Sequence, residues 1–282
     1  AVNALIAPWF ERRRPAALGM AYNGASLGGV IFSPLWIALI AGIGFVAAAL
    51  AVGGVMVLAV GLLALGVFRR TPESLGQGPD GAAPVARIVA SAAPLPRRSL
   101  RRDRRFVTLA AGMMLGLFAQ IGLLAHLFSL LVPVLGEGAA GLAMGGATLA
   151  AIAGRSAVGG LMPAGADRRL VACASYGVQA VGSVLFVVAA GEGGLWLAGG
   201  IALFGLGIGN ATSLPPLIAQ QEFAPAEVAR VVPLIVAIGQ GGYAFAPAAF
   251  GLLRGGAEGT ALFLAAAAVQ IAAIGCFLAG RR

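Results

Sequence analysis

A single arginine inside a long apolar stretch is the residue of this chain best placed to do chemistry. Residues 139–163 are small and apolar, are numerous enough to cross a bilayer, and include one charged side chain, Arg155. No acidic residue lies beside it in the sequence. A guanidinium at membrane depth costs about 2.5–3.5 kcal/mol on insertion scales, so another group must compensate it. Its planar set of N–H donors suits two-point binding of a carboxylate, and the compensating group could therefore be a transported anion.

A purely structural role for Arg155 is the alternative. The residue lies about eight residues from the inner end of its predicted helix, which corresponds to a depth of about 12 Å. At that depth the guanidinium could instead bond to backbone carbonyls near the cytoplasmic ends of the helices. In the first case replacement of Arg155 removes transport, and in the second case transport survives largely intact.

The single histidine, His126, is the second candidate. It lies in the predicted helix 106–135, where it could bind a substrate oxygen, carry a proton, or simply pack against backbone carbonyls. The only Asp or Glu within a predicted span is Glu258, at the outer end of 257–280, so no acidic residue is expected at membrane depth. A proton-coupled mechanism would therefore depend on His126, on helices outside this sequence, or on the carboxyl group of the substrate. Without proton coupling, the protein would be an exchanger or a uniporter.

Several uncharged polar side chains also fall inside predicted spans. Amides that face lipid are costly, so some of these groups must line a cavity and others must form hydrogen bonds between helices. Tyr22 is the member of the set for which a cavity position is least expected. The candidates for cavity lining are Asn23, Gln120, Asn210, Gln240 and Tyr243.

The elements that must position these residues are membrane-spanning helices. The chain has 282 residues, of which 60% are hydrophobic and only 10% charged, whereas soluble domains carry about 25% charged residues. The apolar runs are too long, and alternate too little, for the strands of a membrane barrel. The sequence therefore predicts an all-α membrane protein with eight spans, at residues 16–40, 43–68, 106–135, 138–162, 169–190, 194–219, 228–253 and 257–280.

The arginines predict the orientation of these spans. All basic residues except Arg155 and Arg254 fall in loops or at ends on the same side of the membrane, which the positive-inside rule makes cytoplasmic. The net charge of +9 is therefore a topology signal, and we expect no nucleic-acid partner. The expected partners are the lipid bilayer and a small solute.

Cofactor chemistry and enzymatic catalysis are not expected. Cys173 and Cys276 lie in apolar runs, and neither metal-ligand spacing nor a disulfide framework is present. An enzyme inside the membrane would need a nucleophile with a base, a metal site or a pair of carboxylates. His126 alone supplies none of these.

An internal repeat predicts the domain organisation. A shift of 213 residues places Gly28 on Gly241 and Pro34 on Pro247, which implies a repeating unit of six helices. The segment 69–105 is rich in Pro, Gly and Arg and should be a flexible cytoplasmic linker. The sequence thus predicts the last two helices of one bundle in 1–68, the linker in 69–105, and a full six-helix bundle in 106–282. Four further helices are expected upstream.

These patterns resemble the major facilitator superfamily over essentially the whole chain. WFERRRPAALGMAYNGASLGGVIFSP resembles the fifth helix, and the loop before it, of the branch that contains monocarboxylate porters and oxalate/formate antiporters. RRTPESLGQGPDG resembles the start of the central loop of that branch, and GRSAVGGLMPAGADRR resembles its eighth helix and the following turn. FGLGIGN and QGGYAFAPAAFG resemble its tenth and eleventh helices. The chain would then hold the last eight of twelve helices.

The resemblance implies two six-helix bundles that rock about a central cavity. It matches Arg155 to a substrate-binding arginine of the eighth helix, and it makes Asp167, Arg168 and Arg169 parts of a cytoplasmic gating turn. Ala164 stands where the first Asp of that turn would be. Dicarboxylate relatives use a second cation on the eleventh helix, and none lies near Gln240.

The expected function is therefore that of an antiporter or symporter for a small organic anion, favouring a monocarboxylate, in a bacterial inner membrane. The sequence does not decide whether a proton or a counter-anion is the coupling partner. The alternatives are an exporter of a drug-like or neutral solute, with Arg155 structural, and a scaffold or inactive fragment.

Overall fold

Helices are the only regular secondary structure in the part of the chain that the structure describes. The computed structural model describes residues 2–82, 99–163, 165–189, 194–254 and 259–281, and these ranges contain no strand. This confirms the predicted all-α class. The chain forms two compact units, Ala1–Ala90 and Ser91–Arg282, with their boundary inside the predicted linker.

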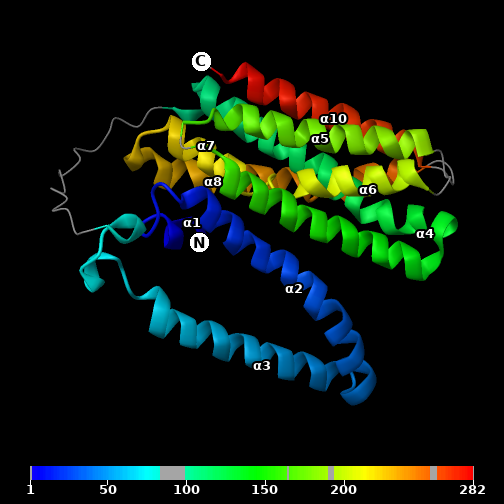
Figure 1. The fold of residues 1–282 in the computed structure, drawn as a ribbon, viewed down its shortest axis with the longest axis horizontal. Coiled ribbons are helices and arrows are strands. Elements are labelled where there is room, and N and C mark those ends of the chain that lie inside the picture. The colour runs from blue at the N-terminus through cyan, green and yellow to red at the C-terminus, as the bar shows by residue number, and fades with distance from the viewer. Residues whose placement is uncertain (1, 83–98, 164, 190–193, 255–258, 282) are drawn as a thin grey trace. The chain divides into compact units, whose positions relative to one another are not determined.

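The first unit contains a helical hairpin. Helix α1 (Val2–Ile6) precedes the long helix α2 (Arg14–Ile43), and α3 (Phe45–Leu63) follows after a single residue, continuing as a π-helical turn (Ala64–Phe68). That residue, Gly44, has φ 79°, which L side chains rarely adopt, so the chain reverses there in one step. Figure 1 shows α2 and α3 joined at this turn.

Part of the predicted linker folds onto the turn before α2. Residues 73–75 and 79–81 form short 3₁₀ turns. The Asp80 carboxylate accepts hydrogen bonds from the backbone N–H groups of Glu11, Arg12 and Arg13 at 3.2, 2.8 and 3.4 Å. Burial raises the pKa of Asp80, but these N–H groups and the charge of Arg13 outweigh it, so the pKa lies below its ordinary value. The start of the linker is therefore anchored within the first unit.

The second unit begins with a helix that reverses direction. Helix α4 (Arg104–Leu161) consists of two helical arms joined at a kink, where Gly136 has the non-helical angles φ 76° and ψ 163°. In Figure 1 the chain turns back at this end of α4. Its two arms, residues 104–135 and 137–161, correspond to the predicted spans 106–135 and 138–162. The Asp103 side chain caps the first arm by accepting from the Arg105 backbone N–H at 2.9 Å.

Two predicted spans are each divided into two helices. The span 194–219 consists of α6 (Leu195–Ile208), a turn, and α7 (Leu214–Glu222), while the span 228–253 consists of α8 (Pro225–Tyr243) and α9 (Ala246–Leu252). The shorter helix of each pair has proline in its first turn, where a residue without a backbone N–H is favoured. The remaining helices are α5 (Arg168–Ala189) and α10 (Thr260–Ala279).

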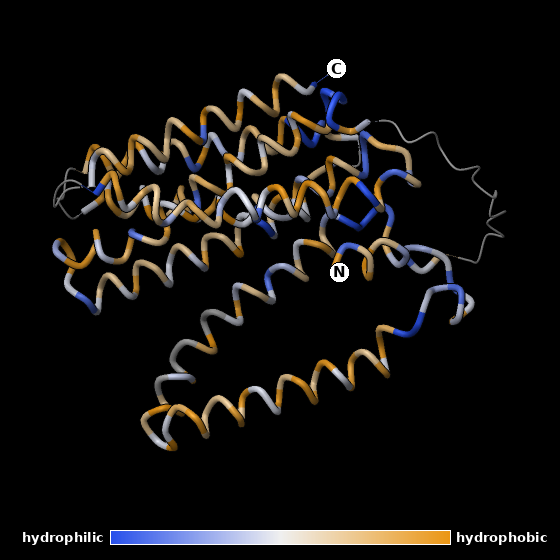
Figure 2. The backbone as a smooth tube through the Cα atoms, turned by 180° about the vertical axis from the view of Figure 1, so that it is seen from behind, coloured by the Kyte–Doolittle hydropathy of each residue, from blue (hydrophilic) through white to orange (hydrophobic). Residues whose placement is uncertain are grey.

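Five described helical segments are long and apolar enough to cross a membrane. They are Phe45–Phe68, both arms of α4 taken as one 58-residue segment, α5, the α8–α9 segment and α10, and the apolar α6 is shorter. Figure 2 shows apolar residues along the helices of the second unit and hydrophilic residues gathered at helix ends near the C-terminus.

The core of the second unit lies between α4, α5, α6 and α10. Phe186 of α5 contacts the rings of Phe204 and Phe263 at centroid distances of 6.2 and 5.0 Å. Glycines allow the backbones to approach closely, as small residues commonly do between membrane helices. A Cβ at Gly154 in the second arm of α4 would lie 2.1 Å from the Leu206 carbonyl oxygen of α6.

Replacing Gly154 by alanine should destabilise the protein. The added methyl cannot fit against the α6 backbone without moving a helix, and such overpacking costs about 1–3 kcal/mol. Gly160→Ala, in the same arm, is the matched control because no atom lies within 4 Å of its added Cβ. Thermal unfolding of the purified proteins in detergent should therefore show a lower midpoint for Gly154→Ala only. Equal midpoints for both variants would refute the close α4–α6 packing.

Candidate functional site

Arg155 lies at the place where α6 ends. Its side chain is buried, with 7% of its surface exposed, and its Nε donates to the Gly209 carbonyl oxygen at 2.6 Å. Gly209 has no side chain, and a Cβ there would lie 2.2 Å from the Ala151 carbonyl oxygen, so only glycine allows the turn this close to α4. The acceptor is a neutral carbonyl at a helix end, which is the kind of contact that the structural role for Arg155 predicts.

Two predicted cavity residues are buried acceptors. Asn210 follows Gly209 directly and is 3% exposed, while Gln120 on the first arm of α4 is 6% exposed. Within the described residues, neither Asn210 Oδ1 nor Gln120 Oε1 has a hydrogen-bond partner. Nearly all buried polar atoms are hydrogen-bonded, so each oxygen is a place for a water or a polar ligand to donate. The structure thus brings Arg155 and Asn210 together at one turn.

His126 lies beside the other interruption. Its Nε2 is 2.9 Å from the carbonyl oxygen of Pro247, in the first turn of α9. Because a carbonyl can only accept, Nε2 carries the proton in this contact. Tyr243 ends α8 just before the interruption and is half-buried, and Gln240 one turn earlier is exposed. Arg155 and His126 therefore each donate to a carbonyl at an interrupted helix, a feature of discontinuous helices around transporter binding sites.

Asn23 lies on α2 of the first unit and is 8% exposed.

Other buried polar residues were not recognised in the sequence. Ser183 of α5 donates to Gln270 Oε1 of α10 at 3.0 Å, and both are fully buried. Gln179, one turn before Ser183, has both amide atoms without a partner among the described residues. The glutamines inside the predicted spans 169–190 and 257–280 were the signal that could have revealed a polar contact between these two helices.

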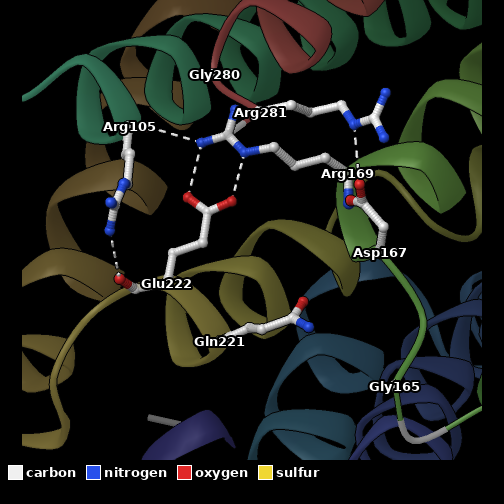
Figure 3. Close-up of a pocket in the computed structure, with 8 residues that line it drawn as sticks. All are labelled: Arg105, Gly165, Asp167, Arg169, Gln221, Glu222, Gly280 and Arg281. Carbon is white, nitrogen blue, oxygen red and sulfur yellow. Dashed lines mark hydrogen bonds and ion pairs between the residues drawn. The ribbon is translucent and has the colours of Figure 1, made fainter.

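The residues predicted to form a gating turn are held in a network of hydrogen bonds (Figure 3). Arg169 is 2% exposed, and its Nε and Nη2 donate to the two carboxylate oxygens of Glu222 at 2.5 and 2.9 Å. Its other N–H groups donate to Thr108 Oγ1 and to the carbonyls of Phe277 and Arg105, at 3.1, 3.2 and 3.0 Å. All five donors of the guanidinium are thus engaged, and Arg169 joins the ends of α4, α5, α7 and α10.

Glu222 escaped the sequence analysis because it lies beyond the predicted span 194–219. An acid in a loop on the same side as two arginines was the available signal. Arg168 donates to the carbonyl of Leu217 in α7. Gln221 Nε2 donates to the Ala166 carbonyl at 3.3 Å, so α7 also contacts the turn before α5.

Asp167 has two roles at the start of α5. One carboxylate oxygen accepts from the backbone N–H groups of Arg169 and Leu170 at 2.9 and 3.3 Å, and the other accepts from Arg281 Nε at 2.8 Å. Burial raises the pKa of Asp167, but the Arg281 hydrogen bond and the two N–H groups outweigh it and hold the pKa below its ordinary value.

This lowered pKa predicts a small, pH-dependent contribution to stability. A carboxyl group whose pKa is lower in the folded state stabilises that state above its unfolded pKa, near 4, and the contribution is lost as the pH falls through the folded value. Both partners are 41% exposed, so we expect a thermal midpoint for Asp167→Asn only about 2–4 °C below that of the parent at pH 7. The gap should narrow as the pH falls below the unfolded pKa. A gap that stays constant from pH 7 to pH 3 would contradict this assignment.

A pocket of about 320 Å³ opens beside this network. It is polar, and the described residues contain no cluster of three or more side chains that could hold a metal ion. The pocket lining consists of Arg105, Gly165, Asp167, Arg169, Gln221, Glu222, Gly280 and Arg281.

Residues 1–247 match the family model described as Major Facilitator Superfamily. The chain belongs to this superfamily. It is therefore a multi-pass membrane transporter, and superfamily members are in general not enzymes. A comparison with curated proteins found no match. In this major facilitator protein, helix interruptions lie beside Arg155 and His126, and the arginine–carboxylate network lies at helix ends.

Proposed function

We propose that this transporter moves a small organic anion, most simply a monocarboxylate, across a bacterial inner membrane by alternating access. Arg155 binds the carboxylate of the solute. The observation that carries the proposal is the placement of a buried guanidinium, with a neutral carbonyl at 2.6 Å, in the second arm of α4, whose one acidic residue, Glu137, lies at the opposite end of the arm. A carboxylate would supply the charge and the two acceptors that the guanidinium favours.

Other polar groups of the second unit support a small polar ligand. Asn210 Oδ1 and Gln120 Oε1 are buried acceptors that can receive a hydroxyl or a protonated carboxyl. His126 Nε2 faces a carbonyl that a competing acceptor could replace. We assign the remaining predicted residues of the second unit, Gln240 and Tyr243, to the path of the solute, and Asn23 of the first unit is a separate candidate. One buried cation suits a monoanion better than a dianion.

A neutral or drug-like solute is the second candidate. The bond from Arg155 Nε to the Gly209 carbonyl favours it, because a guanidinium that holds the end of α6 needs no substrate to do so. The Arg155 side chain would then stabilise the turn between α6 and α7 in every state of the transport cycle.

Uptake into proteoliposomes separates these candidates. The full-length protein would be assayed with labelled monocarboxylates, dicarboxylates and neutral sugars, with and without a pH gradient and with and without internal counter-anion. Saturable uptake of one monocarboxylate, inhibited by other monocarboxylates, supports the proposal. Uptake confined to neutral solutes contradicts it. The two gradients identify the proton or the counter-anion as coupling partner.

A further inference from the structure

The pocket beside the arginine–carboxylate network contains charged groups to which a gating role assigns no ligand. It lies where the first arm of α4 begins, where α5 begins and where α7 and α10 end, all within the second unit. In Figure 3, Arg105 and Arg281 lie on either side of the ion pair between Arg169 and Glu222. The pocket is therefore a charged hollow at the ends of several apolar helices.

The three arginines of the pocket differ in what they can still bind. Arg169 has all five N–H donors engaged by protein acceptors, so it serves as structure. Arg105 uses one donor, from Nη1 to the Glu222 carbonyl at 3.3 Å, and Arg281 uses its Nε on Asp167. Within the described residues, the other guanidinium N–H groups of Arg105 and Arg281 have no hydrogen-bond partner.

The charges of the lining favour an anion. Asp167 and Glu222 balance two of the three guanidinium groups, which leaves one positive charge in a pocket of about 320 Å³. Arginine binds phosphate oxygens through paired N–H groups, and basic pockets between membrane helices on the cytoplasmic side bind the headgroups of anionic lipids. A phosphate group is therefore the ligand chemistry that the free donors suit.

Exposed apolar side chains adjoin the pocket in the sequence. Val107, Leu170 and Leu278 lie within three residues of the lining residues Arg105, Arg169 and Arg281, and are 44%, 42% and 44% exposed. Each lies one to three residues further into an apolar helix than the arginine near it. This order of charge and apolar surface fits an amphiphile, with its phosphate in the pocket and its acyl chains along the helices.

We propose that the pocket lined by Arg105 and Arg281 binds the phosphodiester headgroup of an anionic phospholipid from the arginine-rich side of the membrane. The lipid joins the start of α4 to the end of α10 and stabilises the second unit. This site is independent of the solute that is transported.

The test measures thermal unfolding of the purified protein in detergent during titration with short-chain phosphatidylglycerol. We expect phosphatidylglycerol to raise the midpoint saturably, and phosphatidylcholine with the same chains to do so at least tenfold less effectively. The Arg105→Gln/Arg281→Gln double variant should weaken the apparent affinity at least tenfold. Arg230→Gln is the matched control, because it removes one exposed charge of the same side outside the pocket, and it should change the affinity less than twofold.

A second variant guards against loss of folding in the first. Gln221→Glu keeps both arginines, adds a carboxylate of the same shape to the pocket lining, and should also weaken phosphatidylglycerol binding at least tenfold. Equal binding of phosphatidylcholine overturns the proposal. Equal weakening by Arg230→Gln also overturns it, because diffuse surface charge would then suffice. Inorganic phosphate that raises the midpoint as effectively as phosphatidylglycerol replaces the lipid by free phosphate as the ligand.

Discussion

Replacing Arg155 by glutamine should strongly weaken uptake of the proposed carboxylate substrate while leaving the protein folded. Hydrogen bonds to a charged group contribute about 1.5–3 kcal/mol, so loss of the guanidinium should lower the apparent affinity for the anion by about 10- to 150-fold. Glutamine retains an N–H donor for the Gly209 carbonyl, which should preserve the turn after α6. Arg155→Lys keeps the charge but loses the planar fork, and an intermediate loss is expected.

The measurement is concentration-dependent uptake into proteoliposomes, accompanied by thermal unfolding of each variant. Arg230→Gln serves as a control for loss of one positive charge elsewhere in the second unit. A folded Arg155→Gln protein that transports the anion as well as the parent would show that the guanidinium is structural. The proposal for the substrate class would then fail, although membership of the major facilitator superfamily would not be affected.

Replacing Glu222 by glutamine will destabilise the protein more than any other single change proposed in this network. Arg169 is 2% exposed and Glu222 is 19% exposed, so the substitution leaves a buried guanidinium without its counter-charge. Removing one partner of a buried pair costs about 3–5 kcal/mol, whereas loss of an exposed pair costs about 0–1 kcal/mol. Arg281→Gln, which breaks the exposed pair with Asp167, is the matched comparison.

The double variant Arg169→Gln/Glu222→Gln separates an electrostatic cost from a steric one. With both charges removed, part of the lost stability should return, and the double variant should unfold at a higher temperature than Glu222→Gln alone. These midpoints would be measured without added phospholipid. If the double variant is less stable than either single variant, the two side chains act independently and the ion pair is not the source of the effect.

Helix positions in the second unit were largely predictable from the sequence. Hydropathy and flanking charges gave spans at 169–190 and 257–280, against the observed Arg168–Ala189 and Thr260–Ala279. The turn expected between residues 135 and 138 is present at Gly136. These features follow from local properties, because a bilayer sets the length of an apolar run and charged residues set its ends.

The interruptions of the helices were not predictable in the same way. The residues from Gly209 to Ser213 include the polar Asn210, Thr212 and Ser213, but polar side chains also occur inside membrane helices, so these residues do not by themselves fix where α6 ends. What ends the helix is tertiary: close approach to Ala151 and the bond from Arg155. The acceptor of that bond is a backbone carbonyl, which every residue carries and which leaves no mark in the sequence.

The residues of the candidate site also separate into those that the sequence revealed and those that depend on tertiary contacts. Arg155 was conspicuous because a charge in an apolar run is rare, and Asp167 and Arg169 were found through a resemblance. Glu222 was missed because its role depends on α7 meeting α5 in space. Asp80 was missed because the segment around it was expected to be flexible, whereas three consecutive backbone N–H groups hold its carboxylate.

The turn inside α4 has a consequence for the gene as well as for the protein. Gly136 combines φ 76° with ψ 163°, a region of backbone conformation that is essentially confined to glycine, although no atom lies within 4 Å of where a Cβ would be. The restriction therefore comes from the backbone conformation alone, and replacing a neighbouring residue by a smaller one cannot relieve it. Every glycine codon begins with two fixed bases, so at this codon only third-position changes would be silent. A library of all substitutions should show position 136 as intolerant, beside an exposed and permissive Glu137.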